Sequence, residues 1–129
     1  MSISESGRPL RLRALRGATT ADANDPGAII EATAELLREM IRRNDVDPDD
    51  VVSMIFTATP DLDAEFPATA ARKIGISHVP LLCAREIDVP DAVGRCVRVL
   101  MHLHTDRDPA ALKHVYLGDA KQLRTDLPE

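Results

Sequence analysis

The chain is poor in aromatic side chains: its 129 residues include no Trp, two Phe and one Tyr. A hydrophobic core must therefore be built mainly from aliphatic side chains, which the 44% hydrophobic content can supply. Basic residues are outnumbered by acidic ones, and the formal net charge of −5 argues against a general binder of nucleic acid. A chain of this length is expected to fold as one domain.

Cysteines and long apolar runs are scarce as well. Cys83 and Cys96 have neither metal-ligand nor redox-motif spacing, and no segment approaches the roughly 20 apolar residues of a membrane-spanning helix. His102 and His104 alternate along a predicted strand, but no carboxylate or cysteine accompanies them at a useful spacing, so we expect no metal site. These absences favour a cytoplasmic protein without membrane association.

Hydrophobic periodicity divides the chain into alternating strands and helices. Apolar residues at helical spacing follow Asp25 and Pro26 and predict a helix that ends near Asn44. The nearly continuous apolar run at 51–58 predicts a strand covered on both faces. The other expected elements are strands at about 10–19, 78–83, 95–105 and 115–123, and short helices at about 67–74 and 109–113.

This β-α-β-α-β-β-α-β order predicts an α+β (α/β-like) fold in which helices cover one face of a mixed β-sheet. Such a sheet keeps a second apolar face, which we expect another subunit to cover. Residues 1–9 are predicted to be a flexible arm, residues 10–124 the folded domain, and residues 125–129 a polar C-terminal tail.

Two arginines stand among the apolar residues of predicted strands. Arg16 shares a strand face with Leu10 and Leu12, and Arg98 lies between two valines. We interpret both side chains as pointing inward. Because burying an unpaired charge is costly, two inward arginines predict a pocket for an anion.

Five segments, in order, resemble one family, the small trimeric chorismate mutases of the AroH class. The segments are RALRGATT at 13–20, ATPDL at 58–62 with FPA at 66–68, the segment 79–89 ending in EIDV, CVRV at 96–99, and HVYL at 114–117 with LR at 123–124. The resemblance covers nearly all of the chain from about Leu10 onward. Each segment alone is a weak signal, but five with compatible spacing are highly specific.

The resemblance implies the rearrangement of chorismate to prephenate, an intramolecular Claisen shift without cofactor, metal or covalent intermediate. It also implies a homotrimer with a pseudo-barrel core and with active sites in clefts between adjacent subunits. The substrate is a dianion, and negative charge grows on its ether oxygen as the C–O bond breaks. Catalysis therefore needs a compact substrate conformer and a positive donor at that oxygen.

The resemblance also implies roles for single residues. Arg98 matches the donor to the ether oxygen, Arg16 matches the arginine that holds a carboxylate and the ether region, and Glu86 matches the acceptor of the ring hydroxyl. In the empty site, Glu86 is expected to pair with Arg98. The implied substrate-binding residues are Tyr116, Cys83, Phe66, Arg72, Ala68, Leu82, Leu123 and Arg124. From the residues alone, Tyr116 could equally be a core tyrosine, and Cys83 a small buried hydrophobe.

Some of these residues are implied to act across a subunit boundary, and two positions depart from the family pattern. Phe66 and Arg72 match residues that close the pocket from the partnering chain, and Arg124 begins a tail that folds over the substrate. Thr69 stands where the family usually has a lysine, and Leu82 where it has a small polar residue. We expect these departures to affect affinity more than the type of reaction.

Two other interpretations remain open. One is a similar trimeric family that hydrolyses reactive enamines and imines, although the motif around its arginine is absent here. The other is a non-catalytic trimeric module that binds a carboxylated metabolite, and the acid Glu86 beside Arg98 argues against it. An assay for the loss of chorismate distinguishes all three.

Overall fold

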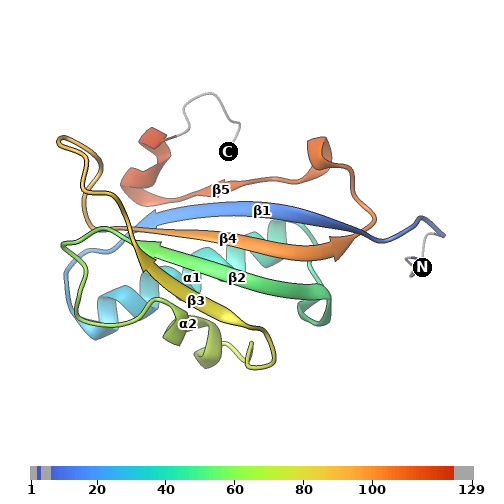
Figure 1. Cartoon of the computed structure of the whole chain (residues 1–129), viewed down its shortest axis with the longest axis horizontal. Helices are drawn as coiled ribbons and strands as arrows, with labels where there is room; N and C mark the ends of the chain where they lie inside the picture. Colours follow the sequence, from blue (N-terminus) through green and yellow to red (C-terminus); the bar gives the residue numbers. More distant parts are fainter. Residues whose placement is uncertain (1–2, 4–6, 124–129) are drawn as a thin grey trace.

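A mixed β-sheet with two α-helices forms the part of the chain that the computed structural model describes, namely residue 3 and residues 7–123 (Figure 1). The strands are β1 (Arg11–Thr20), β2 (Val51–Ala58), β3 (Leu81–Arg85), β4 (Cys96–Thr105) and β5 (Val115–Tyr116). The α-helices are α1 (Pro26–Arg43) and α2 (Ala68–Lys73). Three 3₁₀ turns are η1 (Pro48–Asp50), η2 (Pro109–Ala111) and η3 (Gly118–Leu123).

The strand order across the sheet is β3-β2-β4-β1-β5. The central strand β4 runs antiparallel to both β1 and β2, whereas the outer pairs β2–β3 and β1–β5 are parallel. In this register Arg98 lies opposite Ala18 of β1 and Thr57 of β2, and Arg16 lies opposite Leu100. Arg16 and Arg98 are therefore diagonal neighbours on one face of the sheet.

Both α-helices cover the same face of the sheet, which we call the helix-covered face. Helix α1 begins where the Asp25 side chain accepts a hydrogen bond from the Ala28 amide at 2.8 Å, with Pro26 at the first helical position. Its inward side chains, among them Leu37, pack with Phe56 of β2 in one continuous aliphatic core. Helix α2 adds small buried alanines to the same cluster.

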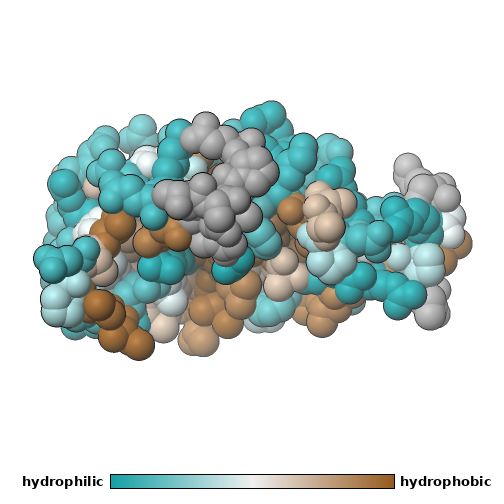
Figure 2. Space-filling model, turned by 90° about the horizontal axis from the view of Figure 1, so that it is seen from above, coloured by the Kyte–Doolittle hydropathy of each residue, from teal (hydrophilic) through white to brown (hydrophobic). Residues whose placement is uncertain are grey.

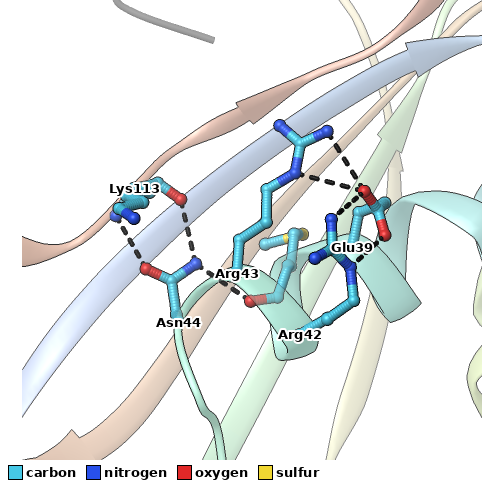
Figure 3. Close-up of polar contacts among 6 residues, drawn as sticks. Glu39, Arg42, Arg43, Asn44 and Lys113 are labelled. Carbon is cyan, nitrogen blue, oxygen red and sulfur yellow. Dashed lines mark hydrogen bonds and ion pairs between the residues drawn. The ribbon is translucent and has the colours of Figure 1, made fainter.

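The C-terminal end of α1 is fastened to the segment that precedes β5 (Figure 3). The buried Asn44 side chain donates to the Lys113 carbonyl and accepts from the Lys113 amide, at 2.9 and 2.7 Å. In the last turn Glu39 accepts hydrogen bonds from Arg42 and Arg43, and the bond from Arg42 is the main reason that the pKa of Glu39 falls to about 2. This junction fixes where β5 starts.

On the opposite face of the sheet, which we call the open face, the described part of the chain places no α-helix, and only the 3₁₀ turn η3 packs there, over Ala18 and Cys96. Large hydrophobic side chains remain exposed there, including Leu12 of β1, Val52 of β2 and Leu82 of β3. Seen from above, hydrophobic surface gathers along the edge that corresponds to the front of Figure 1, and the opposite edge is mostly hydrophilic (Figure 2). The expected coverage of residues 51–58 on both faces is not met within one chain, because Ile55 and Thr57 stay half-exposed.

The inward orientation predicted for the two arginines is wrong within the single chain. Leu15 and Gly17 are the inward residues of β1, and Arg16 lies exposed on the open face. Gly17 explains this phase: a Cβ there would lie 2.4 Å from the Met40 sulfur, so the missing side chain allows α1 to approach the strand. Arg98 lies on the open face as well.

Most predicted elements are confirmed, and the departures lie near the chain's later turns. The helix at 26–43 and the strands at 51–58 and 96–105 agree closely with the sequence patterns. The third strand lies at 81–85 rather than 78–83, and the helix expected at 109–113 is the 3₁₀ turn η2. The last strand contains only two residues, because Gly118 (φ +57°) turns the chain into η3.

Candidate active site on the open face

The open face is hollowed by a pocket of about 350 Å³, which we call the arginine pocket. It contains two of the predicted catalytic side chains, Arg16 and Arg98, together with Tyr116 and Leu123 from the end of the described chain. The full lining is Arg16, Gly17, Ala18, Ile55, Thr57, Arg98, Val99, Leu100, Tyr116 and Leu123.

The sheet register gathers these residues from distant parts of the sequence. Pairing of β1 with β4 places the two arginines side by side, and pairing of β1 with β5 places Tyr116 opposite Ala18. The backbone amide of Arg16 donates to the His114 Nδ1 atom at 3.0 Å, which ties β1 to the start of β5. The pocket is therefore built on strands, which hold side chains more firmly than loops do.

Glu86 lies beside the arginine pocket, where its carboxylate contacts two of the lining residues. Its amide donates to the Ala58 carbonyl at 2.9 Å, which extends the β2–β3 pairing by one residue. One carboxylate oxygen lies 3.5 Å from the Arg98 Nε atom, and the other accepts a hydrogen bond from the Thr57 hydroxyl. The Glu86 side chain is 18% exposed and that of Arg98 48% exposed. The prediction that Glu86 pairs with Arg98 is confirmed.

The arginine pocket has an excess of positive charge. Glu86 offsets part of the charge of Arg98, but within the described part of the chain no ion pair involves Arg16. Two guanidinium groups therefore line the pocket, and one carboxylate lies beside Arg98. Such a site attracts an anion even though the whole chain is acidic.

A loop cluster holds the beginning of β4, two residues before Arg98. The Asp61 carboxylate accepts from the Arg95 amide at 2.8 and 3.0 Å and from the Thr59 hydroxyl, which itself accepts from the Cys96 amide at 2.9 Å. Burial alone would raise the pKa of Asp61, but these hydrogen bonds outweigh it and lower that pKa. For the buried Cys96 thiol, burial dominates and raises the pKa, although the charge of Arg98 opposes it.

A second pocket, of about 320 Å³, lies beside β3, and we call it the Phe66 pocket. Phe66 is 66% exposed at its rim, and Cys83 and Arg85 contribute from β3. The two pockets share no lining residue. One chain therefore brings Arg16, Arg98, Tyr116 and Leu123 together, but it places Phe66 and Cys83 in a separate group.

Of the other predicted substrate-binding residues, the three that the structure describes lie outside both pockets. Ala68 is buried in the core beneath α2. Arg72 is exposed on α2 and donates to the Thr69 hydroxyl at 3.4 Å. Leu82 is 61% exposed on the open face of β3. Arg124 lies outside the described residues.

Six residues that line the arginine pocket are not among the predicted site residues: Gly17, Ala18, Ile55, Thr57, Val99 and Leu100. The alternation along the strand that contains Arg98 could have indicated Leu100. The sequence alone could not indicate Ile55 and Thr57, because only the β2–β4 register places them beside Leu100 and Arg98. That register includes an irregularity between Val51 and Ser53, which no sequence pattern signals.

The mixed sheet and its cationic pocket define an α+β protein that is equipped to bind a small anion. Residues 12–127 match the family Chorismate mutase type I, and the chain belongs to this family. The resemblance found in the sequence is thereby confirmed.

Individual relatives agree with the family match. The chain is 45% identical over 117 residues to "Chorismate mutase AroH" of Thermus thermophilus, covering 90% of this chain and 96% of the relative. It is 41% identical over 119 residues to the protein of the same name from Bacillus subtilis, covering 92% and 94%. A solved chorismate mutase structure from Clostridium thermocellum superposes with a TM-score of 0.84 at 49% identity, covering 85% of this chain and 98% of that one.

Two further observations concern the described residues only. None of their helices combines the length and the hydropathy that a membrane span requires. No group of three or more His, Cys, Asp or Glu side chains among them is arranged to hold a metal ion.

Proposed function

We propose that this protein converts chorismate to prephenate by an intramolecular Claisen rearrangement, in clefts between the subunits of a homotrimer. The observation that carries the proposal is the arginine pocket, in a chain of the chorismate mutase type I family. Its two arginines suit a substrate with two carboxylates. Its Glu86–Arg98 pair suits a substrate that carries a hydroxyl as well as an ether oxygen.

The reaction needs no proton transfer, so the side chains act by position and charge. Arg98 donates to the ether oxygen, where negative charge grows as the C–O bond breaks, and Arg16 holds a carboxylate beside it. Glu86 accepts a hydrogen bond from the ring hydroxyl. Tyr116 directs its own hydroxyl to a carboxylate from the wall formed by β5.

The expected magnitudes are consistent with enzymatic catalysis. One preorganised donor at a developing oxyanion contributes about 3–4 kcal/mol to the barrier reduction. Holding the substrate in its compact conformer contributes several kcal/mol more. Together these effects reach the ~8 kcal/mol at the lower end of enzymatic rate acceleration.

Several features support the trimer. The open face exposes hydrophobic side chains that a partner sheet would cover, and Phe66 projects from a pocket that lacks both catalytic arginines. In the proposed cleft, Phe66 and Arg72 of one subunit close the arginine pocket of the next. Cys83 and Leu82 then belong to the walls between subunits, whereas Ala68 is buried in the core of its own chain.

Two remaining parts of the proposal concern the tail and the compartment. Arg124 directly follows Leu123 in the sequence, and the presence of Leu123 in the arginine pocket supports a tail that covers the bound substrate. Cys83 and Cys96 are free thiols, which supports the reducing cytoplasm as the location of the protein.

The test is the loss of chorismate absorbance with the full-length protein, together with its mass by sedimentation velocity. We expect saturable prephenate formation by a trimer that requires no added metal or cofactor. Enamine and imine substrates serve as the comparison, and we expect no turnover of them. The proposal would be overturned if chorismate rearranged only at its uncatalysed rate in the presence of the folded protein.

A further inference from the structure

We infer that Thr57 is a positioning residue for Glu86: its hydroxyl holds the carboxylate beside the arginine pocket, so that Arg98 is free to turn to the substrate. This inference rests on the proposed function and assigns a role to a residue that the sequence analysis passed over. Thr57 itself is not required to touch the reacting atoms.

The geometry places Thr57 between the two charged partners. It lies directly opposite Arg98 on β4 and opposite Ala84 on β3, and Glu86 follows Ala84 by two positions along the same edge. Its hydroxyl donates to Glu86 Oε2, and the other carboxylate oxygen faces Arg98 Nε. The two oxygens of Glu86 are thus held by different residues.

Glu86 needs such a support because of where it lies. It follows the last residue of β3, which is an edge strand, so a neighbouring strand flanks it on one side only. Its contact with Arg98 spans 3.5 Å, which is long for a charge-assisted hydrogen bond. Arg98 alone therefore holds the carboxylate weakly.

The proposed reaction makes this weakness important. When Arg98 directs its guanidinium to the ether oxygen, its grip on Glu86 loosens further, and the second support must remain. Thr57 provides one from a strand in the middle of the sheet, and its branched side chain has few accessible χ1 rotamers. The hydroxyl therefore keeps Glu86 beside the pocket while Arg98 changes partners.

The experiment is a double-mutant cycle that combines Thr57→Val with Glu86→Gln, read as kcat and KM for chorismate. Valine preserves the shape of Thr57 and replaces its hydroxyl with a methyl group. We expect Thr57→Val to lower kcat/KM by about 10- to 100-fold, as for a hydrogen bond to a charged group. In the Glu86→Gln background the same change should cost less than about twofold, because the group it positions is already altered.

Two further variants separate positioning from a structural role. Thr57→Ser retains the hydroxyl, and its kcat/KM should stay within about threefold of the wild type. Ser53→Ala is the matched control: Ser53 lies on the same strand, its hydroxyl contacts His102 at 3.1 Å outside the pocket, and its removal should leave kcat/KM unchanged. The thermal midpoint of Thr57→Val should equal or exceed that of the wild type.

The outcomes are distinct. If Thr57→Val keeps kcat/KM within about twofold of the wild type, or loses equally in both Glu86 backgrounds, the inference is wrong. Failure of Thr57→Ser to rescue activity would overturn it as well. If Thr57→Val does not fold, Thr57→Ala takes its place in the cycle. A wild-type protein without mutase activity contradicts the proposed function instead, so the two failures cannot be confused.

Discussion

The two faces of the sheet differ in how fully a single chain buries them. On the helix-covered face, α1 and α2 bury Leu15, Phe56 and their neighbours in a continuous aliphatic core. On the open face, exposed hydrophobic residues stand beside Arg16 and Arg98. The same strands thus serve stability on one side and chemistry on the other, and alternation along each strand separates the two roles.

The largest expected effect on the open face is the loss of the Arg98 guanidinium. Arg98→Gln should lower kcat/KM for chorismate by at least about 100-fold, because one preorganised donor is lost. Arg98→Lys should also be poor, since a point charge cannot reproduce the planar donor set. Arg11→Gln, an exposed arginine on β1 outside the pocket, is the control. Near-normal turnover in Arg98→Lys would show that the donor is misassigned.

The next effect compares two leucines on one strand. Leu15→Ala should lower the free energy of unfolding by about 2–5 kcal/mol, because Leu15 is fully buried beneath α1. Leu12→Ala, at a side chain that is 55% exposed on the open face of one chain, should cost less than Leu15→Ala, because only a partner subunit can bury it further. Urea unfolding at one protein concentration measures both values. Equal losses would mean that the assembled protein buries the open face as deeply as the helix-covered face.

A smaller effect concerns the loop cluster at the start of β4. Because the folded pKa of Asp61 is lowered, its stabilising contribution is complete above its unfolded pKa of about 4 and is lost as the pH falls through the lower folded value. Asp61→Asn should therefore cost about 1 kcal/mol at pH 7, and progressively less toward pH 2. Urea unfolding across this range is the measurement. A cost independent of pH would contradict the assigned hydrogen bonds.

The smallest expected effect concerns Cys96, which is buried although it lies on the open face. Cys96 lies in the Arg98 row of side chains yet is buried against Ala18 and Ala120, whereas Cys83 is half-buried at the sheet edge. Burial raises the pKa of the Cys96 thiol and lowers its thiolate fraction. Iodoacetamide at pH 8 should therefore modify Cys83 first, as followed by peptide mass spectrometry. Faster labelling of Cys96 would show that η3 does not cover it.

The sequence was sufficient for the elements and the key charges, but not for the orientation of strands. Periodicity located α1 and β2 almost to the residue, since apolar spacing directly reflects burial. The inward face of β1 was misread because alternation alone cannot say which face a helix covers. The deciding feature was Gly17, whose missing side chain admits Met40.

The candidate site was predictable only in part for a similar reason. Arg16, Arg98, Glu86 and Tyr116 follow from the family resemblance, and the Glu86–Arg98 contact was anticipated. Thr57 was not, because its place beside Arg98 depends on the pairing of two strands that are distant in sequence rather than on any local motif. The short length of the last strand was missed because the chain turns at Gly118, where φ is +57°.

The separation of the arginine pocket from the Phe66 pocket has a genetic consequence under the proposed assembly. Each polypeptide would contribute residues to two different active sites. In a trimer that mixes wild-type and variant subunits, one variant subunit would therefore affect more than one active site. Conversely, co-expressing an Arg98→Gln chain with a Phe66→Ala chain would restore some active sites. In those sites the Phe66→Ala chain would supply Arg98, and the Arg98→Gln chain would supply Phe66. Two dead alleles would then complement each other.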